Sequence, residues 1–299
     1  MDTLLRALNE PETMRIVAAT TTASVREACR RQGVTGVAAV ALGRALTAGV
    51  LLATLAKGEK ERVRIHLQGD GPLGALLVDA HGDGSVRACF DSEHTPDTPL
   101  ASGDQARIST AQALGTAGHL VITRDLGFGH PYQGSVELSS GEVDEDIEYY
   151  LDHSEQLPTI LRTEEVLDSQ GHVLRSAGIL VQGFPGADSD LLDLPRARLE
   201  PGNLRSLLLA HERTTRELVG LALGGAPFRA MLEHSIQFRC NCGPARAQTV
   251  LSTLGASDLE KLALERPETE VKCSFCGDIT VVSADQLREL AGRLRESHS

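Results

Sequence analysis

The order of apolar and polar residues predicts two helices followed by strands in the first third of the chain. Residues 21–32 have helical composition, and residues 37–56 form a longer stretch rich in alanine, leucine and valine. Apolar and polar residues then alternate over 63–67, which is typical of a strand with one buried face. Two further short apolar runs, at 75–80 and 85–90, are bounded by glycine-containing turns. The pattern predicts an antiparallel meander.

The same pattern continues to about residue 184. It predicts two more strands, a helix and a hairpin, over residues 119–124, 135–138, 142–156, 158–167 and 172–184. Ser139 and Glu142 have the spacing of a capping box and predict where the helix begins. We therefore expect residues 1–184 to form an α+β domain with a mostly antiparallel sheet.

The composition changes at residues 185–190, and the segment that follows is predicted to contain helices of low intrinsic stability. Short helices are predicted over 203–210 and 214–223, and the glycine-containing residues 224–227 end the second of them. Helices of this length are marginal in water unless they pack against something else. Residues 185–234 are thus predicted to be a helical linker. Its composition fits both an ordinary helical subdomain and a segment whose order depends on its neighbours.

A small module is predicted from residue 235 to residue 299. Its expected elements are strands and helices over residues 235–239, 244–254, 257 onward, 270–272, 279–282 and 284 onward. Two of the helices are preceded by capping-box patterns, Ser257 with Glu260 and Ser283 with Gln286.

The stretch 37–56 is long enough to be mistaken for a membrane span. Arg44 lies near its middle, where a charge in lipid costs about 2.5–3.5 kcal/mol. We therefore expect a buried core helix and no membrane partner. The N-terminal residues show no basic region followed by an apolar run, so no signal peptide is predicted. We expect a soluble, cytoplasmic protein.

The net charge of the chain excludes some classes of binding partner. The chain has 29 basic and 41 acidic residues, a formal net charge of −12. Residues 141–200 hold 14 acidic and 4 basic side chains, a net charge of −10. An acidic chain argues against broad binding to nucleic-acid phosphates.

The strongest chemical signal is a set of four cysteines near the C-terminus. Cys240 and Cys242 form C-x-C, and 30 residues later Cys273 and Cys276 form C-x-x-C. Four thiolates on two tight turns match a tetrahedral zinc site. They fill the coordination shell and leave no position for a water molecule, so a hydrolytic zinc enzyme is disfavoured.

The spacing alone leaves the role of this zinc open. A static structural ribbon is one interpretation. A nucleic-acid-binding ribbon is another, although residues 236–299 hold 8 basic and 9 acidic side chains. A redox switch is the third. Oxidation can close Cys240–Cys242 and Cys273–Cys276 without moving distant segments, and the small ring of the first pair favours easy reduction.

Other motifs have simpler explanations. Residues 69–74 match G-x-G-x-x-G, but a strand-like segment follows them, whereas a dinucleotide site requires a helix. We interpret them as a hairpin turn. Cys29 and Cys89 are predicted to be small core residues, and whether either has a redox role is left open. The histidines are scattered, so no catalytic residue and no enzyme activity are predicted.

Several motifs, spread over nearly the whole chain, resemble the heat-shock protein 33 family of redox-regulated chaperonins. They lie at residues 21–27, 41–48, 69–74, 131–134, 149–156, 238–242 and 272–276. The resemblance implies three regions: an N-terminal client-binding domain (1–184), a metastable linker (185–234) and a C-terminal redox-switch domain (235–299).

The resemblance also implies a function. It implies an ATP-independent holdase that is inactive when reduced and loaded with one Zn²⁺, and active after oxidation and zinc release. Its partners would be thermally unfolding or oxidatively damaged proteins, and the active form would be a homodimer. We expect the acidic residues of 141–200 to keep a client-loaded protein soluble. The alternative is a zinc-ribbon protein that binds nucleic acid or acts in translation.

Overall fold

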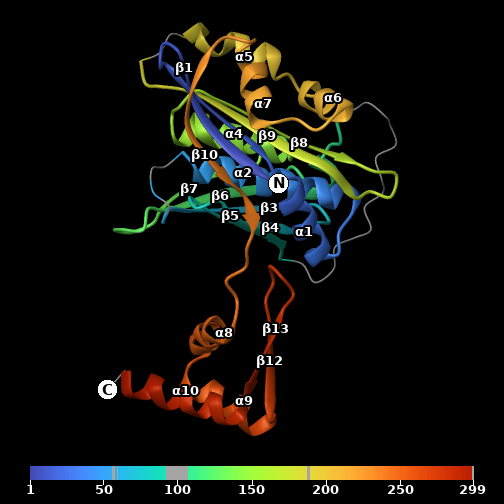
Figure 1. Ribbon diagram of the computed structural model, residues 1–299. Coiled ribbons are helices and arrows are strands. Elements are labelled where there is room, and N and C mark those ends of the chain that lie inside the picture. The colour runs from blue at the N-terminus through green and yellow to red at the C-terminus, as the bar shows by residue number, and fades with distance from the viewer. Residues whose placement is uncertain (56–57, 59, 92–106, 187–188, 298–299) are drawn as a thin grey trace. The chain divides into compact units, whose positions relative to one another are not determined.

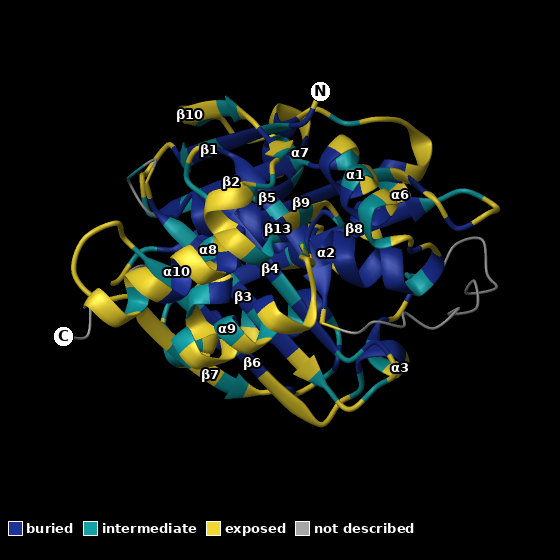
Figure 2. Ribbon diagram, turned by 90° about the horizontal axis from the view of Figure 1, so that it is seen from below, coloured by how far each residue is buried: buried dark blue, intermediate teal, exposed yellow. Residues whose placement is uncertain are grey.

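The apolar stretch around Arg44 forms α2 (Gly36–Ala53), the central helix of the structure. By length and composition α2 could cross a membrane, but 94% of it is buried inside the protein. It lies between two β-sheets and is dark along its length in the burial colouring (Figures 1 and 2). The predicted core helix is confirmed.

The structure is a computed structural model that describes residues 1–55, 58, 60–91, 107–186 and 189–297. Two compact units make up the chain, Met1–Arg239 and Cys240–Ser299. The predicted linker, as far as it is described, therefore folds as part of the first unit. The division falls next to Cys240, five residues after the predicted boundary at 234/235.

One face of α2 packs against a five-stranded antiparallel sheet in the order β10-β1-β2-β9-β8. The strands are β1 (Thr3–Asn9), β2 (Met14–Thr20), β8 (Thr159–Leu167), β9 (Val173–Gly183) and β10 (Phe228–Ser235). The hairpin of β8 and β9 was predicted, whereas β1 and β2 were not. Both of these strands are largely buried on both faces, so their sequences lack the alternation that marks a half-exposed strand.

The other face of α2 packs against a six-stranded sheet in the order β11-β5-β4-β3-β6-β7. The strands are β3 (Arg62–Gly69), β4 (Ala75–His81), β5 (Ser85–Phe90), β6 (Gly118–Asp125), β7 (Tyr132–Glu137) and β11 (Gln237–Phe238). This confirms the predicted meander, and residues 69–74 form a hairpin turn. Two sheets thus stand where one was expected, and β11 pairs with β5 in parallel.

Helices α1 (Thr22–Gln32), α3 (Ala111–Leu114) and α4 (Val143–Ser154) complete the layer around α2. The capping box predicted for α4 is wrong. Glu142 is itself the N-cap residue, and its carboxylate accepts a hydrogen bond from Arg44 at 2.8 Å. The backbone N–H of Ser139 instead donates to Asp146 Oδ1 at 2.8 Å. The Glu142 carboxylate binds the buried Arg44 and therefore does not cap the Ser139 backbone N–H.

Short helices cover the outer face of the first sheet (Figure 1). They are η1 (Ser189–Leu192), α5 (Asp193–Arg198), α6 (Asn203–Ala210) and α7 (Thr215–Ala222). The predictions of α6 and α7 are confirmed, but the end of the expected helical linker forms β10. Six of the eight β10 side chains are exposed, so its conformation follows from backbone pairing with β1 and leaves little trace in the apolar pattern.

The second unit has its own small core. Its elements are α8 (Pro244–Leu251), η2 (Ser252–Leu254), α9 (Ala256–Glu265), β12 (Glu268–Lys272), β13 (Ile279–Ser283) and α10 (Ala284–Ser297). Ser283 and Gln286 form the predicted capping box. The box predicted at Ser257 is wrong, because Gly255 is the N-cap residue and α9 already begins at Ala256. The α+β fold class is confirmed.

Candidate functional site

The four C-terminal cysteines form one cluster. Their Sγ atoms all lie within 4.8 Å of one another. Two of the distances join the two motifs: Cys240 Sγ lies 3.6 Å from Cys273 Sγ, and Cys242 Sγ lies 3.2 Å from Cys276 Sγ. Two motifs separated by 30 residues thus converge on one point, and the four side chains are positioned to bind a metal ion.

Backbone turns place each pair of cysteines. Cys273 follows the last residue of β12, and its N–H donates to Asp278 O at 2.9 Å while Gly277 N–H donates to Cys273 O at 2.8 Å. Gly277 has φ +75°, a left-handed conformation that favours glycine. Cys242 precedes Gly243, the N-cap residue of α8. Cys273 and Cys276 thus lie in a hydrogen-bonded turn, and Cys240 and Cys242 lie directly before the start of α8.

Thiols gathered in this way favour a bound cation. Burial raises the pKa of the Cys242 thiol and of the Cys276 thiol above their usual range. A metal ion stabilises the thiolate forms, because its charge opposes the repulsion between them. The donor set therefore fits a soft or borderline divalent metal.

The other two cysteines lie apart from this cluster. Cys29 and Cys89 are buried in the first unit, 7% and 2% exposed. Burial raises the pKa of Cys29 to about 12, which makes its thiol a poor nucleophile. Both positions agree with the prediction of small core residues. In the described part of the chain, the four C-terminal cysteines form the single group of at least three metal-ligating side chains.

The linker helices dock through a continuous apolar contact. Leu204 and Leu208 of α6 and Leu218 and Val219 of α7 are at most 3% exposed. They pack with side chains from the outer face of the first sheet: Leu5, Ala7, Ile16, Ala18, Ile160, Val166, Ile179 and Val181. The helices are short, so this contact supplies most of their stability.

Arginines from the strands and from α6 add polar contacts to this docking. Arg162 of β8 donates to Leu199 O at 3.0 Å. Arg175 of β9 donates to Leu209 O at 3.1 Å, near the end of α6, where a cation also complements the helix dipole. Arg205 of α6 donates to the backbone oxygen of Glu165 at 2.8 Å and lies 3.3 Å from Glu164 Oε1.

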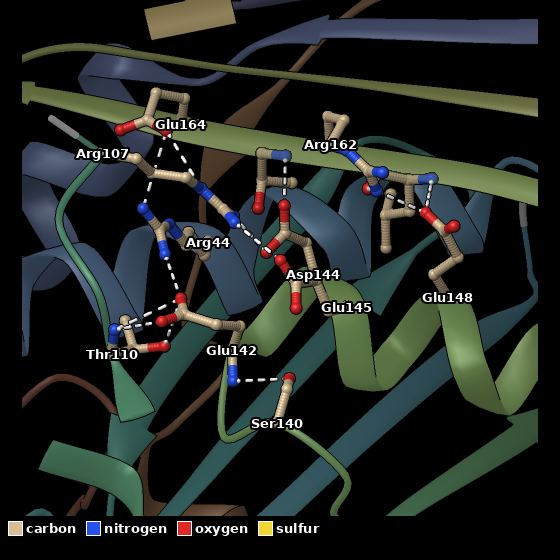
Figure 3. Close-up of polar contacts among 12 residues, drawn as sticks. Arg44, Arg107, Thr110, Ser140, Glu142, Asp144, Glu145, Glu148, Arg162 and Glu164 are labelled. Carbon is tan, nitrogen blue, oxygen red and sulfur yellow. Dashed lines mark hydrogen bonds and ion pairs between the residues drawn. The ribbon is translucent and has the colours of Figure 1, made fainter. Parts of the chain in front are cut away.

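Glu164 lies 3.3 Å from Arg205 of the linker. It also belongs to a buried charge network around Arg44 and Arg107, which Figure 3 shows. Arg44 of α2 is fully buried and lies 2.8 Å from Glu142, 3.6 Å from Glu164 and 3.7 Å from Glu165. Arg107 contacts Asp144 and lies 3.4 Å from Glu164. The network therefore joins α2, the chain before α3, α4, β8 and α6.

Several carboxylates of the acidic segment 141–200 belong to this network or are buried close to it in sequence. Asp144, Asp146, Glu164 and Glu165 are at most 2% exposed. Asp144, Glu164 and Glu165 lie close to Arg107 or Arg44, whereas Asp146 accepts hydrogen bonds from the backbone N–H groups of residues 139–141. Burial also raises the pKa of Glu165 well above its usual range. The contribution of the segment's net charge to solubility stays a prediction.

Comparisons with known proteins agree with this geometry. The sequence model of the Hsp33 protein family matches residues 2–282. A 33 kDa chaperonin of Synechococcus sp. (strain JA-3-3Ab) is 37% identical over 294 residues, covering 98% of this chain and 91% of the relative. The 33 kDa chaperonin of Bacillus cereus (strain B4264) is 32% identical, covering 98% of this chain and 99% of the relative.

A solved structure matches the whole fold. The crystal structure of the 33 kDa chaperonin (heat shock protein 33 homologue) of Thermotoga maritima superposes with a TM-score of 0.83 at 25% identity. The match covers 98% of this chain and 99% of that one. From its sequence, its fold and its four converging cysteines, the chain belongs to the Hsp33 protein family.

Proposed function

We propose that this protein is a redox-regulated, ATP-independent holdase that acts in the cytoplasm during oxidative stress. In the reduced state Cys240, Cys242, Cys273 and Cys276 hold one zinc ion, and the linker helices cover the first sheet. Oxidation releases the metal and uncovers surface that binds unfolding proteins. The observation that carries the proposal is the convergence of four Sγ atoms within 4.8 Å.

Zinc fits this donor set best. Four thiolates at about 2.3 Å from a tetrahedral ion lie about 3.8 Å from one another, close to the 3.2 and 3.6 Å of the two pairs that join the motifs. A zinc ion held by these four sulfurs would have a complete shell and would supply no catalysis. It supplies stability, on the order of 10–16 kcal/mol in small zinc modules, to a unit whose core has eight buried apolar residues.

Oxidation removes the ligands. Each pair of thiolates forms one S–S bond and gives two electrons to an oxidant such as hypochlorous acid or a peroxide, which is reduced to chloride or water. We propose the pairs Cys240–Cys242 and Cys273–Cys276, because each pair belongs to one short motif and can close without moving distant segments of the chain. A disulfide sulfur is a poor zinc ligand, so the metal and the module's main source of stability are lost together.

Loss of the second unit's fold is proposed to loosen the linker (185–234) as well. If η1 and α5 to α7 leave the first sheet, they uncover side chains such as Ile16, Ile160 and Val181, which are fully buried in the docked state. A contiguous apolar surface of this kind binds unfolding proteins. We further propose that the oxidised, active form is a homodimer and that nucleic acid and membranes are not partners.

The proposal is tested by light scattering from a heat-unfolding client protein. The oxidised, zinc-free protein is expected to suppress aggregation at near-stoichiometric ratios, and the reduced, zinc-loaded protein is expected to have little effect. Adding reductant and zinc should remove the activity again. Equal suppression by both forms would contradict redox control. Retention of RNA by the reduced form, with a steep salt dependence, would favour the nucleic-acid alternative.

A further inference from the structure

One edge of the first sheet is covered by a strand that is held mainly through its backbone. β10 lies along β1 (Figure 1) and pairs with it in antiparallel register from Thr3↔Ser235 to Asn9↔Phe228, with one irregularity between Arg6 and Ala7. Six of the eight β10 side chains are exposed, so the pairing buries little apolar surface. Backbone pairing of this kind does not depend on the sequence of the added strand.

β1 has the composition of an inner strand. Permanent edge strands are commonly protected from pairing with other chains by lysine, proline or exposed charges. The sequence of β1, TLLRALN, has one charged residue, Arg6, whose guanidinium donates to the backbone oxygen of Thr54 at 2.9 Å. Leu4, Leu5 and Ala7 are fully buried. β1 therefore depends on β10 to cover its edge.

One position of β10 is poorly matched to the sheet that it extends. The pairing places Glu233 opposite Leu5, which belongs to the apolar surface under the linker helices. The Glu233 side chain is 49% exposed and lies 3.1 Å from Arg216 of α7 in an exposed ion pair, a kind of contact that contributes little to stability. An apolar side chain opposite Leu5 would stabilise the strand pair more. An extended apolar segment therefore fits this edge better than β10 does.

β10 is continuous with both parts of the chain that oxidation is proposed to loosen. It follows the linker helix α7, and it leads through β11 to Cys240, the first cysteine of the cluster. Because little apolar surface holds β10 on β1, we expect it to leave the sheet when its neighbours on both sides lose their order.

We propose that oxidation vacates the β1 edge and that an extended apolar segment of an unfolding protein replaces β10 there by strand addition. The backbone of the partner pairs with β1, and its apolar side chains lie beside Leu5 on the face that the linker has left. In the reduced protein the chain's own β10 occupies the edge, so binding follows the redox state. The inference rests on the proposed function in taking release of the linker as the event that frees the edge.

The probe is a fluorescein-labelled ten-residue peptide of alternating threonine and valine, added to the full-length protein. Fluorescence anisotropy is expected to show that the oxidised, zinc-free protein binds it at least tenfold more tightly than the reduced, zinc-loaded protein. A peptide N-methylated at alternate residues should bind at least fivefold more weakly, because it lacks the N–H groups that pair with β1. Hydrogen exchange followed by mass spectrometry locates the site: oxidation should raise exchange in residues 3–9, and the peptide should restore their protection.

A variant of β10 tests the competition between the chain's own strand and the partner. Glu233→Val places an apolar residue opposite Leu5, so β10 should stay paired more often, and the oxidised variant should bind the peptide at least fivefold more weakly than the wild type. The control Glu233→Gln removes the same charge and ion pair without adding apolar surface and should change the affinity less than twofold. Both variants should release their zinc on oxidation, as zinc content will show.

Four results would overturn the proposal: no binding by the oxidised protein, equal binding by the reduced protein, equal binding of the N-methylated peptide, or unchanged affinity in Glu233→Val. Protection that the peptide induces only outside residues 3–9 would also do so, because it would assign the peptide to the apolar face alone. Concentration-dependent protection of residues 3–9 without peptide would assign the edge to a second copy of this chain. Failure of the proposed function is recognised separately, as equal client protection by oxidised and reduced wild-type protein.

Discussion

Replacing Cys273 by serine is expected to weaken zinc binding by roughly 100- to 1,000-fold and to unfold the second unit in reducing buffer. The zinc-binding free energy of such modules, on the order of 10–16 kcal/mol, corresponds to about 2.5–4 kcal/mol for each of four thiolates. The neutral hydroxyl of serine supplies little of this binding free energy. Zinc content measured after dialysis against a competing chelator, together with amide exchange of residues 240–297, reports both effects.

The matched control is Cys89→Ser, which alters a buried cysteine outside the cluster and should leave one zinc per chain. Cys29→Ser is a second control of the same kind. Full zinc occupancy in Cys273→Ser would show that the four converging sulfurs are not the metal ligands.

Replacing Leu208 by aspartate is expected to give a protein that suppresses client aggregation in reductant with its zinc still bound. Leu208 is 2% exposed and packs with Leu204 against the first sheet. Removing a buried leucine side chain costs about 2–5 kcal/mol, and a carboxylate in its place adds the penalty of an unpaired buried charge. Short helices gain most of their stability from docking, so a loss of this size is expected to release them from the sheet. Light scattering and zinc content, measured on the same sample, test this result.

The neighbouring residue supplies the control. Leu209 lies on the same helix but is 40% exposed, so Leu209→Asp introduces the same charge with little effect on docking. It should stay inactive in reductant. If Leu208→Asp is zinc-loaded and loosened in amide exchange, yet fails to protect the client, the linker does not gate the activity.

Local patterns predicted the elements whose burial differs clearly between their faces. β3 alternates strictly between buried and half-buried residues over its first six positions, and α6 buries one side only, so the spacing of their apolar residues was informative. β1 and β2 are buried on both faces and β10 on neither. Their conformations depend on pairing with strands that are distant in the sequence. Such pairing cannot be predicted from a short stretch of residues.

The cysteine cluster was predictable because its chemistry is encoded in spacing. Only one part of the charge network, the buried Arg44, could be predicted from the sequence. Arg44 in an apolar stretch signalled a buried cation, but its partners Glu142, Glu164 and Glu165 lie on α4's N-cap and on β8, about 100 positions or more along the chain. For the same reason the sequence did not show that several carboxylates of residues 141–200 are buried against arginines.

The central claim is that oxidation at the four cysteines loosens the linker and the two edge strands β10 and β11, while the remaining strands of both sheets of the first unit stay folded. Hydrogen exchange followed by mass spectrometry compares the reduced, zinc-loaded protein with the oxidised, zinc-free protein directly. We predict that oxidation removes protection across residues 190–297, including α6 and α7, and leaves β3, β4, β8 and β9 protected. Retained protection of α6 and α7 in oxidised protein that suppresses client aggregation would contradict the account.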